Sequence, residues 1–286
     1  MKIIDVIDRI IAYHPSFPAD YNGCDGFKCG DPQAECTGIA VALVPTVDVI
    51  RRAATAGCNL LVVHEPTFFT SLDAAEGSQP FFSAVQEEKA ALLKEYGITV
   101  WRDHDRMHAH QPDSIFTGVI RYLGWEDYRL APEQQPVPMG YAFRLPKTTV
   151  GDLAAYLMKK LDMNGIRFVG KKDAVVETVA IVGHLFPGFG DDDKEEYGQK
   201  IIHAMDLGVD AVIPGEIIEW TALSYVGDAV ALGKTKAVMN IGHFNMEELG
   251  MRFAADWVSE LVEHALPVKY LPTKDLYNYM LNAERM

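Results

Sequence analysis

The chain contains 286 residues, of which 49% are hydrophobic, so it is long enough to bury a substantial core as one large domain or two smaller ones. Its formal net charge is -14 and its isoelectric point is near 5.0. A surface that binds nucleic acid is normally basic, so this charge argues against nucleic acid as a partner. No apolar run approaches the roughly 20 residues that span a bilayer, and we expect no membrane insertion.

The four cysteines, at positions 24, 29, 36 and 58, show no Cys-x-x-Cys spacing. A zinc site formed by Cys24, Cys29 and Cys36 is one alternative, but ordinary buried or free thiols are the more common state of such residues. The first residues lack the pattern of a secretory signal. We therefore expect a cytoplasmic protein.

The first part of the chain predicts alternating helices and strands. Isoleucines on one face predict an amphipathic helix over residues 2–13. Residues 22–31 are rich in glycine and cysteine and predict an irregular loop. A strand over 38–43, a helix over 46–56 and a strand over 60–63 follow, and together they predict a β-α-β unit with parallel strands.

The later part of the chain predicts a similar alternation. Residues 131–140 carry three prolines and two glutamines and predict a connection before a helix over 151–161. Apolar runs predict strands over 175–182, 211–214 and 237–241. The acidic run at 191–193 is better explained as the solvated start of a helix near Tyr197 than as a cation site.

The two parts of the chain are similar in pattern. Around Gly57 and around Gly208, a helix, a glycine, a short apolar strand and a polar end follow one another. We therefore predict an α/β fold of two interlocked, similar lobes with mainly parallel strands. The expected boundaries are residues 1–130 for the first lobe, 131–174 for a connecting segment and 175–286 for the second lobe.

Metal-ligand side chains follow two of the predicted strands. The apolar run 60–63 ends in His64 and Glu65, and a second apolar run ends before His243, with Glu247 four residues later. Imidazole nitrogen and carboxylate oxygen suit divalent zinc, iron, manganese or nickel. A helix in this region puts His243 and Glu247 one turn apart on the same side. Ligand sites of open α/β sheets lie beyond the carboxyl ends of the strands, so we predict a metal site there, between the lobes.

A third cluster follows the strand predicted over residues 98–101. Five acidic or imidazole side chains lie within eight residues, namely Asp103, His104, Asp105, His108 and His110. Either this loop supplies metal ligands or a proton shuttle, or it is a solvated loop whose histidines titrate near neutral pH.

These motifs resemble those of a known family, the YbgI-like dinuclear-metal-centre proteins, often labelled GTP cyclohydrolase 1 type 2. Residues 61–69 resemble its apolar strand with His-His-Pro-x-x-Phe, and residues 100–108 its Val-Tyr-x-x-His-Thr-x-x-Asp segment. Residues 22–31 resemble its early Asp-Asn-x-Gly-Leu-x-x-Gly segment, residues 215–216 its Gly-Asp pair, and residues 242–247 its Gly-His-x-x-x-Glu motif, which is the most specific of these. The resemblance covers nearly the whole chain and implies ring-shaped hexamers.

The resemblance also implies two divalent ions per chain. The family's five metal ligands fall on His64, Glu65, His108, His243 and Glu247. Glu65 stands where the family has histidine and His108 where it has aspartate, so the site keeps three imidazoles and two carboxylates. We predict a retained dinuclear site, with loss of one ion as the alternative. His104 matches a family histidine and Glu216 replaces a family aspartate, and both are candidate catalytic or supporting residues.

A dinuclear centre of this type predicts hydrolase chemistry. Two ions about 3.5–4 Å apart can share a hydroxide and polarise a carbonyl, amidine or phosphoryl group. We therefore expect a metal-dependent hydrolase with a small substrate, nucleotides being among the candidates and cyclohydrolase or phosphoester chemistry being left open. The alternative is a non-enzymatic protein for metal storage, delivery or regulated assembly, which would release metal without turnover.

Overall fold

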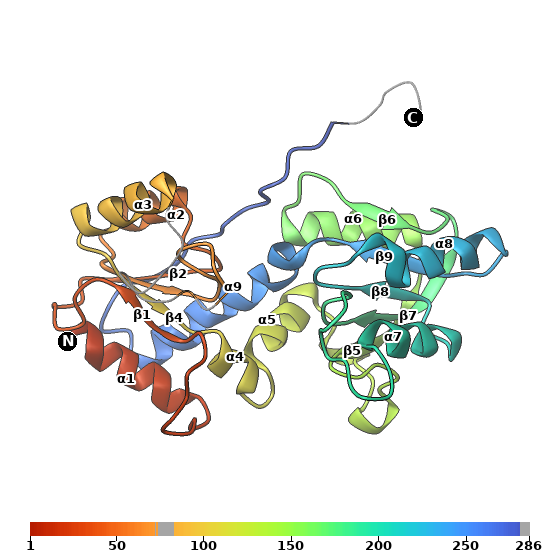
Figure 1. Ribbon diagram of the computed structural model, residues 1–286, viewed down its shortest axis with the longest axis horizontal. Helices are drawn as coiled ribbons and strands as arrows, with labels where there is room; N and C mark the ends of the chain where they lie inside the picture. Colours follow the sequence, from red (N-terminus) through yellow and green to blue (C-terminus); the bar gives the residue numbers. More distant parts are fainter. Residues whose placement is uncertain (72, 74–82, 281–286) are drawn as a thin grey trace. The chain divides into compact units, whose positions relative to one another are not determined.

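The computed structural model describes residues 1–71, 73 and 83–280. The chain forms two compact units, each with one five-stranded sheet (Figure 1). Unit 1 comprises Met1–Val119 and Glu247–Thr273, and unit 2 comprises Ile120–Met246 and the described residues from Lys274 onward. Five of the eight strand pairs formed by the described residues are parallel, which confirms the predicted α/β class with mainly parallel strands.

Unit 1 is built on a sheet of strand order β1-β4-β3-β2-β10, in which only β1 is antiparallel to its neighbour. Its elements are α1 (Ile3–Tyr13), β1 (Gly26–Cys29), β2 (Ile39–Ala42), α2 (Val47–Thr55), β3 (Leu60–Val63), α3 (Ala84–Glu95), β4 (Thr99–Arg102), α4 (Asp105–Ala109), the start of α5 (Ser114–Leu123), α9 (His243–Leu261) from Glu247 onward, and β10 (Val268–Tyr270).

The three central strands of unit 1 are buried at every position. Helices α2 and α3 connect them and pack on one face of the sheet, with Val49, Ile50 and Leu93 in the same core cluster as Leu61 and Val63. Helix α1 lies on the other face in Figure 1 and stacks on α9 through the rings of its Tyr13 and of Trp257. A sheet covered on both faces explains why β2 and β3 are continuous apolar runs.

Unit 2 has the strand order β5-β7-β8-β9-β6, with a parallel centre and an antiparallel strand at each edge. Its elements are the end of α5, η1 (Glu126–Tyr128), η2 (Pro132–Gln134), β5 (Tyr141–Thr149), α6 (Val150–Leu161), β6 (Arg167–Val169), β7 (Val175–Ile181), α7 (Tyr197–Asp206), β8 (Ala211–Ile213), η3 (Glu219–Leu223), α8 (Ser224–Ala231), β9 (Ala237–Asn240) and the start of α9.

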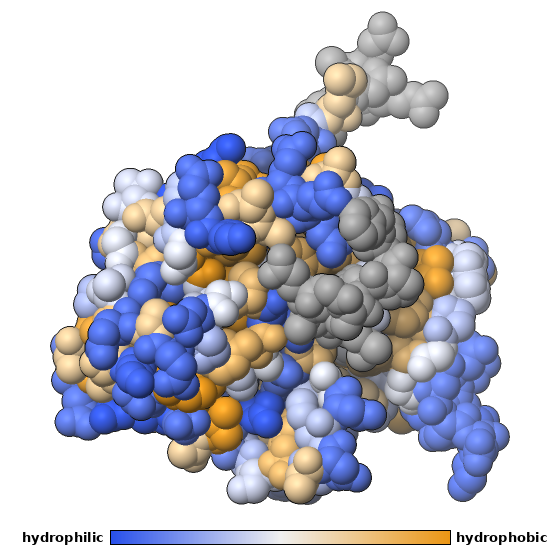
Figure 2. Space-filling view, turned by 60° about the vertical axis from the view of Figure 1, so that its left-hand side comes forward, coloured by the Kyte–Doolittle hydropathy of each residue, from blue (hydrophilic) through white to orange (hydrophobic). Residues whose placement is uncertain are grey.

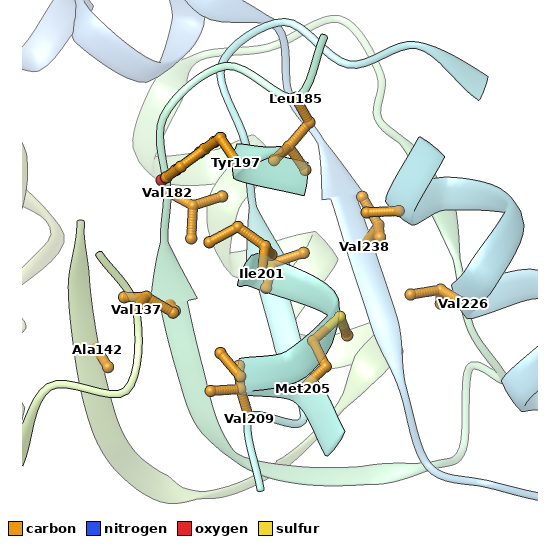
Figure 3. Close-up of a cluster of buried hydrophobic side chains, with 14 residues drawn as sticks. Val137, Ala142, Val182, Leu185, Tyr197, Ile201, Met205, Val209, Val226 and Val238 are labelled. Carbon is orange, nitrogen blue, oxygen red and sulfur yellow. The ribbon is translucent and has the colours of Figure 1, made fainter. Parts of the chain in front are cut away.

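Helices α7 and α8 bury their apolar sides on one face of this second sheet (Figure 3). Ile201 and Met205 of α7 and Val226 of α8 meet Val182, which follows β7, and Val238 of β9 in one cluster of buried side chains. The acidic run 191–193 lies in the loop before α7 and not in its first turn, since the N-cap is Glu196. Oδ1 of Asp191 still accepts a hydrogen bond from the backbone N–H of Tyr197, the first residue of the helix.

Two expectations from the sequence differ from the structure. Residues 22–31 are not wholly irregular, since β1 pairs with β4 and the ring of Phe27 lies 4.9 Å from that of Trp101 across the pair. Residues 131–174 are not a connecting segment, because β5, α6 and β6 belong to unit 2 and two of them are strands of its sheet. Residues 247–273 return to unit 1. These contacts join residues far apart in sequence, which local patterns do not reveal.

Hydrophilic side chains cover much of the face shown in Figure 2, with smaller hydrophobic areas between them. Within the described residues, every helix is too short or too polar to cross a bilayer.

The core of unit 2 gives a direct test of this packing. We expect Ile201→Ala to lower the free energy of unfolding by about 2–5 kcal/mol, because a fully buried side chain leaves a cavity. Leu207→Ala, at a side chain that is 71% exposed next to the end of the same helix, should change it by less than about 0.5 kcal/mol. Urea unfolding followed by circular dichroism measures both variants, and equal losses would contradict the described core.

Candidate metal centre

Three imidazoles of unit 1 come together beyond the ends of two neighbouring strands. His64 follows β3, His104 follows β4, and His108 lies in the short helix α4. Their ring centroids are 4.4 to 4.9 Å apart, and one nitrogen of each ring lies within 4.8 Å of the others. Because β3 and β4 are parallel neighbours, their carboxyl ends meet at the same edge of the sheet.

Each of these three rings has an oxygen acceptor at Nδ1. Nδ1 of His64 is 3.2 Å from the carbonyl oxygen of Asp103, that of His104 is 2.8 Å from Oδ1 of Asp105, and that of His108 is 2.8 Å from Oδ2 of Asp113. Carbonyl and carboxylate oxygens only accept, so each Nδ1 carries the proton and Nε2 is the lone-pair nitrogen. Metal-binding histidines are usually held in this way.

His64 also meets two buried carboxylates. His64 is fully buried, Glu65 is 6% exposed and Glu247 of α9 is 3% exposed, and one ligand atom of each lies within 4.8 Å of the other two. Nε2 of His64 has no hydrogen-bond partner and lies 3.4 Å from Oε2 of Glu247. Burial, together with the neighbouring His104, lowers the pKa of His64 to about 3, so the ring is neutral at physiological pH.

This set of donors fits a divalent cation. A buried lone-pair nitrogen without a hydrogen-bond donor is costly in an apolar interior. Glu65 and Glu247 place two buried carboxylates beside it. Arg102 forms an ion pair with Glu65, at 3.8 Å. A metal ion could bind the nitrogen and both carboxylates, and three imidazoles with two carboxylates are ligands typical of zinc, iron, manganese or nickel.

The loop that carries His104 is held by two aspartates. Asp25 accepts hydrogen bonds from the backbone N–H groups of His104, Asp105 and Arg106, at 2.7 to 3.0 Å, which fixes the start of α4. Asp105 accepts further bonds from the hydroxyl of Tyr21 and the thiol of Cys24. The hydrogen bond from His104 is the main cause of the low pKa of the Asp105 carboxyl, which is therefore ionised.

Cys24 is a hydrogen-bond donor in this arrangement. Burial raises the pKa of its thiol to about 12, so it is not a thiolate at neutral pH. Among the described residues, Cys24 joins a possible ligand group with His104 and Asp105, and no such group contains Cys24, Cys29 and Cys36 together.

A buried pair of side chains, His14 and Asp103, supports the position of His64. Nε2 of His14 is 3.1 Å from Oδ2 of Asp103, and both side chains are completely buried. The backbone carbonyl of the same Asp103 is the acceptor for His64. His14 directly follows α1, and its side chain fixes Asp103, the residue whose carbonyl orients His64.

Unit 2 contains a comparable group beyond three parallel strands. His184 follows β7, Glu216 follows β8, and His243 follows β9 and begins α9. The Glu216 carboxylate contacts Nδ1 of His184 at 2.5 Å and Nδ1 of His243 at 2.9 Å. Burial opposes ionisation of Glu216, but hydrogen bonds from both imidazoles outweigh it and hold the pKa of its carboxyl well below the usual range.

The predicted site residues therefore fall into two groups. His64, Glu65, His108 and Glu247 belong to unit 1, where His104 joins them, and His243 belongs to unit 2 with Glu216. Helix α9 contains both His243 and Glu247, one turn apart, as expected. Common binding of one pair of ions by all five predicted ligands stays a prediction.

Sequence reasoning did not single out His184, Asp25 or Asp113. His184 had the same signal as His64, since it follows an apolar strand after a short interval. The two aspartates act through contacts with residues of α4, and Asp113 also caps α5 by accepting from the backbone N–H of Phe116.

Comparison with known proteins identifies the family. The model of the family described as Duf34/NIF3 (NGG1p interacting factor 3) matches residues 1–275. The chain belongs to this family. Curated members confirm the predicted resemblance: a "GTP cyclohydrolase 1 type 2 homolog" of Clostridium acetobutylicum is 26% identical over 253 residues, covering 86% of this chain and 85% of that protein. A protein with the same name from Clostridium perfringens is 25% identical over 255 residues, covering 86% and 87%.

Solved structures show the same fold. A Bacillus cereus protein related to NIF3 superimposes with a TM-score of 0.70 at 16% identity and covers 98% of this chain and 99% of its own. The protein ybgI, described as of unknown function, superimposes with a TM-score of 0.66 at 18% identity and covers 96% and 99%. These likenesses support the fold of this Duf34/NIF3 protein.

The role of Asp113 as the acceptor for Nδ1 of His108 can be tested without removing a predicted metal ligand. In Asp113→Asn, the amide oxygen can still cap α5, but the NH₂ group then faces Nδ1 and opposes the tautomer that leaves Nε2 for a metal. We expect zinc affinity to fall about 10–100-fold. Asp152→Asn, in the first turn of α6 in unit 2, is the matched control. Calorimetric zinc titration measures both, and unchanged affinity in Asp113→Asn would exclude this role.

Proposed function

We propose that this protein is a metal-dependent hydrolase that binds two divalent ions per chain and acts on a small substrate, with nucleotides as the first class to test. The observation that supports this most is the meeting of His64, His104 and His108, each held at Nδ1 by an oxygen, beside buried Glu65 and Glu247. The names of the curated relatives support nucleotides as substrates to test. A cytoplasmic hexamer belongs to the same proposal.

Most of the gathered side chains would hold the ions. His64, Glu65, His108 and Glu247 supply two imidazoles and two carboxylates in unit 1, and the proposal includes His243 as the fifth ligand. Bound divalent ions in such a site lower the pKa of water and polarise carbonyl or phosphoryl groups. Asp103 and Asp113 keep their imidazoles in the tautomer that presents Nε2.

His104 is the proposed proton carrier. Its side chain is 28% exposed, whereas that of His64 is fully buried, so substrate and solvent can reach it more easily. Asp105 holds Nδ1 of His104 and is ionised, which stabilises the imidazolium formed when Nε2 takes a proton from the attacking nucleophile. The same proton can then pass to the leaving group.

Glu216 is proposed to position the imidazole rings of His184 and His243. Its carboxylate accepts from Nδ1 of His243 and lies against Nδ1 of His184, which also accepts a hydrogen bond from the backbone N–H of Glu216. Glu216 therefore holds both rings in place. This positioning role takes the place of direct proton transfer by Glu216, because its carboxylate already contacts both imidazoles.

The proposal is tested by metal content and turnover measured on the same samples. Tag-free wild-type protein should contain about two ions per chain, and Glu247→Ala should lose metal because one buried carboxylate ligand is gone. His104→Gln should keep its metal and lose about 10²–10⁴-fold in turnover of whichever nucleotide or phosphoester the wild type hydrolyses with manganese, zinc or iron. Elemental analysis and product chromatography provide the readouts.

The control is Glu263→Ala, since the side chain of Glu263 is 80% exposed in the same unit. Wild-type protein without metal would defeat the proposal. Full metal content with no turnover across the panel would favour the non-enzymatic metal-binding alternative, and loss of metal in His104→Gln would make His104 a ligand instead of a proton carrier.

A further inference from the structure

A small groove in unit 2 lies beside the group formed by His184, Glu216 and His243. Its volume is about 190 Å³, and its walls come from the loop after β7, from η3 and from the first turns of α7. Two backbone hydrogen bonds tie the loop after β7 to the loop after β8, from the N–H of Leu185 to the carbonyl of Glu216 at 2.7 Å and from the N–H of Ile218 to the carbonyl of Leu185 at 3.2 Å. Leu185 lines the groove and directly follows His184, so the groove adjoins the histidine group.

One wall of the groove offers aromatic surface to solvent. Trp220 is 64% exposed and Phe186 is 38% exposed, although both side chains are large and apolar. The ring of Phe186 is roughly parallel to that of His184, with centroids 5.8 Å apart, so the aromatic surface continues to the histidine group. Exposed, flat aromatic surface is well suited to stacking against a planar ring.

The other wall offers hydrogen-bond acceptors. Asp191, Glu196 and Gln199 line it near the start of α7. Backbone N–H groups of Tyr197 and Gly188 bond the Asp191 carboxylate and hold its pKa below the usual range, so it is ionised and each of its oxygens keeps a further lone pair. None of the described residues that line the groove is lysine or arginine, so a phosphate group is poorly matched to it.

We propose that this groove binds a planar nitrogen heterocycle with N–H donors on its edge, as in an aminopurine base, by stacking on Trp220 and Phe186. The carboxylates of Asp191 and Glu196 accept hydrogen bonds from the donor edge. The assignment of the bound ring to the hydrolase's own substrate rests on the proposed function, while the binding of the ring does not. A phosphate or sugar attached to the ring then lies outside the groove.

The test uses the full chain after metal removal, with guanosine as the probe because N–H groups of its base lie side by side on one edge. Isothermal titration calorimetry measures binding in every variant. In proteins that keep Trp220, quenching of exposed tryptophan fluorescence also reports on that residue, because Trp101, Trp125 and Trp257 are at most 5% exposed. We expect Trp220→Ala to weaken guanosine binding about 5- to 150-fold and Trp220→Phe to weaken it less. Glu196→Gln should reduce the preference for guanosine over inosine, which lacks one amino group.

Tyr128→Ala is the matched control, at an exposed aromatic residue outside the groove in the same unit. Absence of guanosine binding to wild type, equal binding by Trp220→Ala, or equal binding of ribose 5-phosphate would overturn the proposal. So would protection of wild-type Trp220 from iodide together with an altered oligomeric state in Trp220→Ala, since a second copy of the chain would then cover the groove. Guanosine binding by the metal-free protein, together with no turnover by the metal-loaded protein, would remove the proposed function and leave this site in place.

Discussion

Hydrogen bonds from imidazole Nδ1 atoms to oxygen acceptors determine the chemistry of the candidate centre. A neutral imidazole has one donor and one acceptor nitrogen, so an oxygen at Nδ1 leaves Nε2 as the lone pair. At His64 this nitrogen is buried and has no hydrogen-bond donor. An unsatisfied buried polar atom costs about 1–3 kcal/mol, and a cation shared with Glu65 and Glu247 would relieve it.

In each unit, the same arrangement of parallel strands brings these side chains together. Parallel strands end at a common sheet edge, and the polar residues that follow them are brought together: His64 and His104 after β3 and β4, and His184, Glu216 and His243 after β7, β8 and β9. The supporting acceptor is supplied by a neighbouring loop or helix start in unit 1 and by one shared carboxylate in unit 2. The sheets need burial on both faces, so the reactive groups gather at the strand ends.

Much of this arrangement follows from local sequence. The apolar runs before His64 and His243 predict buried strands, and the isoleucines of residues 2–13 predict α1, because alternation and helical period are local properties. The supporting contacts are not local. Asp25 reaches α4 across about 80 residues of chain, and β1 exists only through its pairing with β4. Such pairings depend on tertiary packing, which a single sequence does not specify.

The protonation pattern of the three histidines is the most direct test of the central claim. Long-range ¹⁵N–¹H spectra of metal-free protein should show His64, His104 and His108 with the proton on Nδ1, and zinc should shift the Nε2 resonances of His64 and His108. Protons found on Nε2 in the metal-free protein, or Nε2 resonances that zinc leaves unchanged, would contradict it.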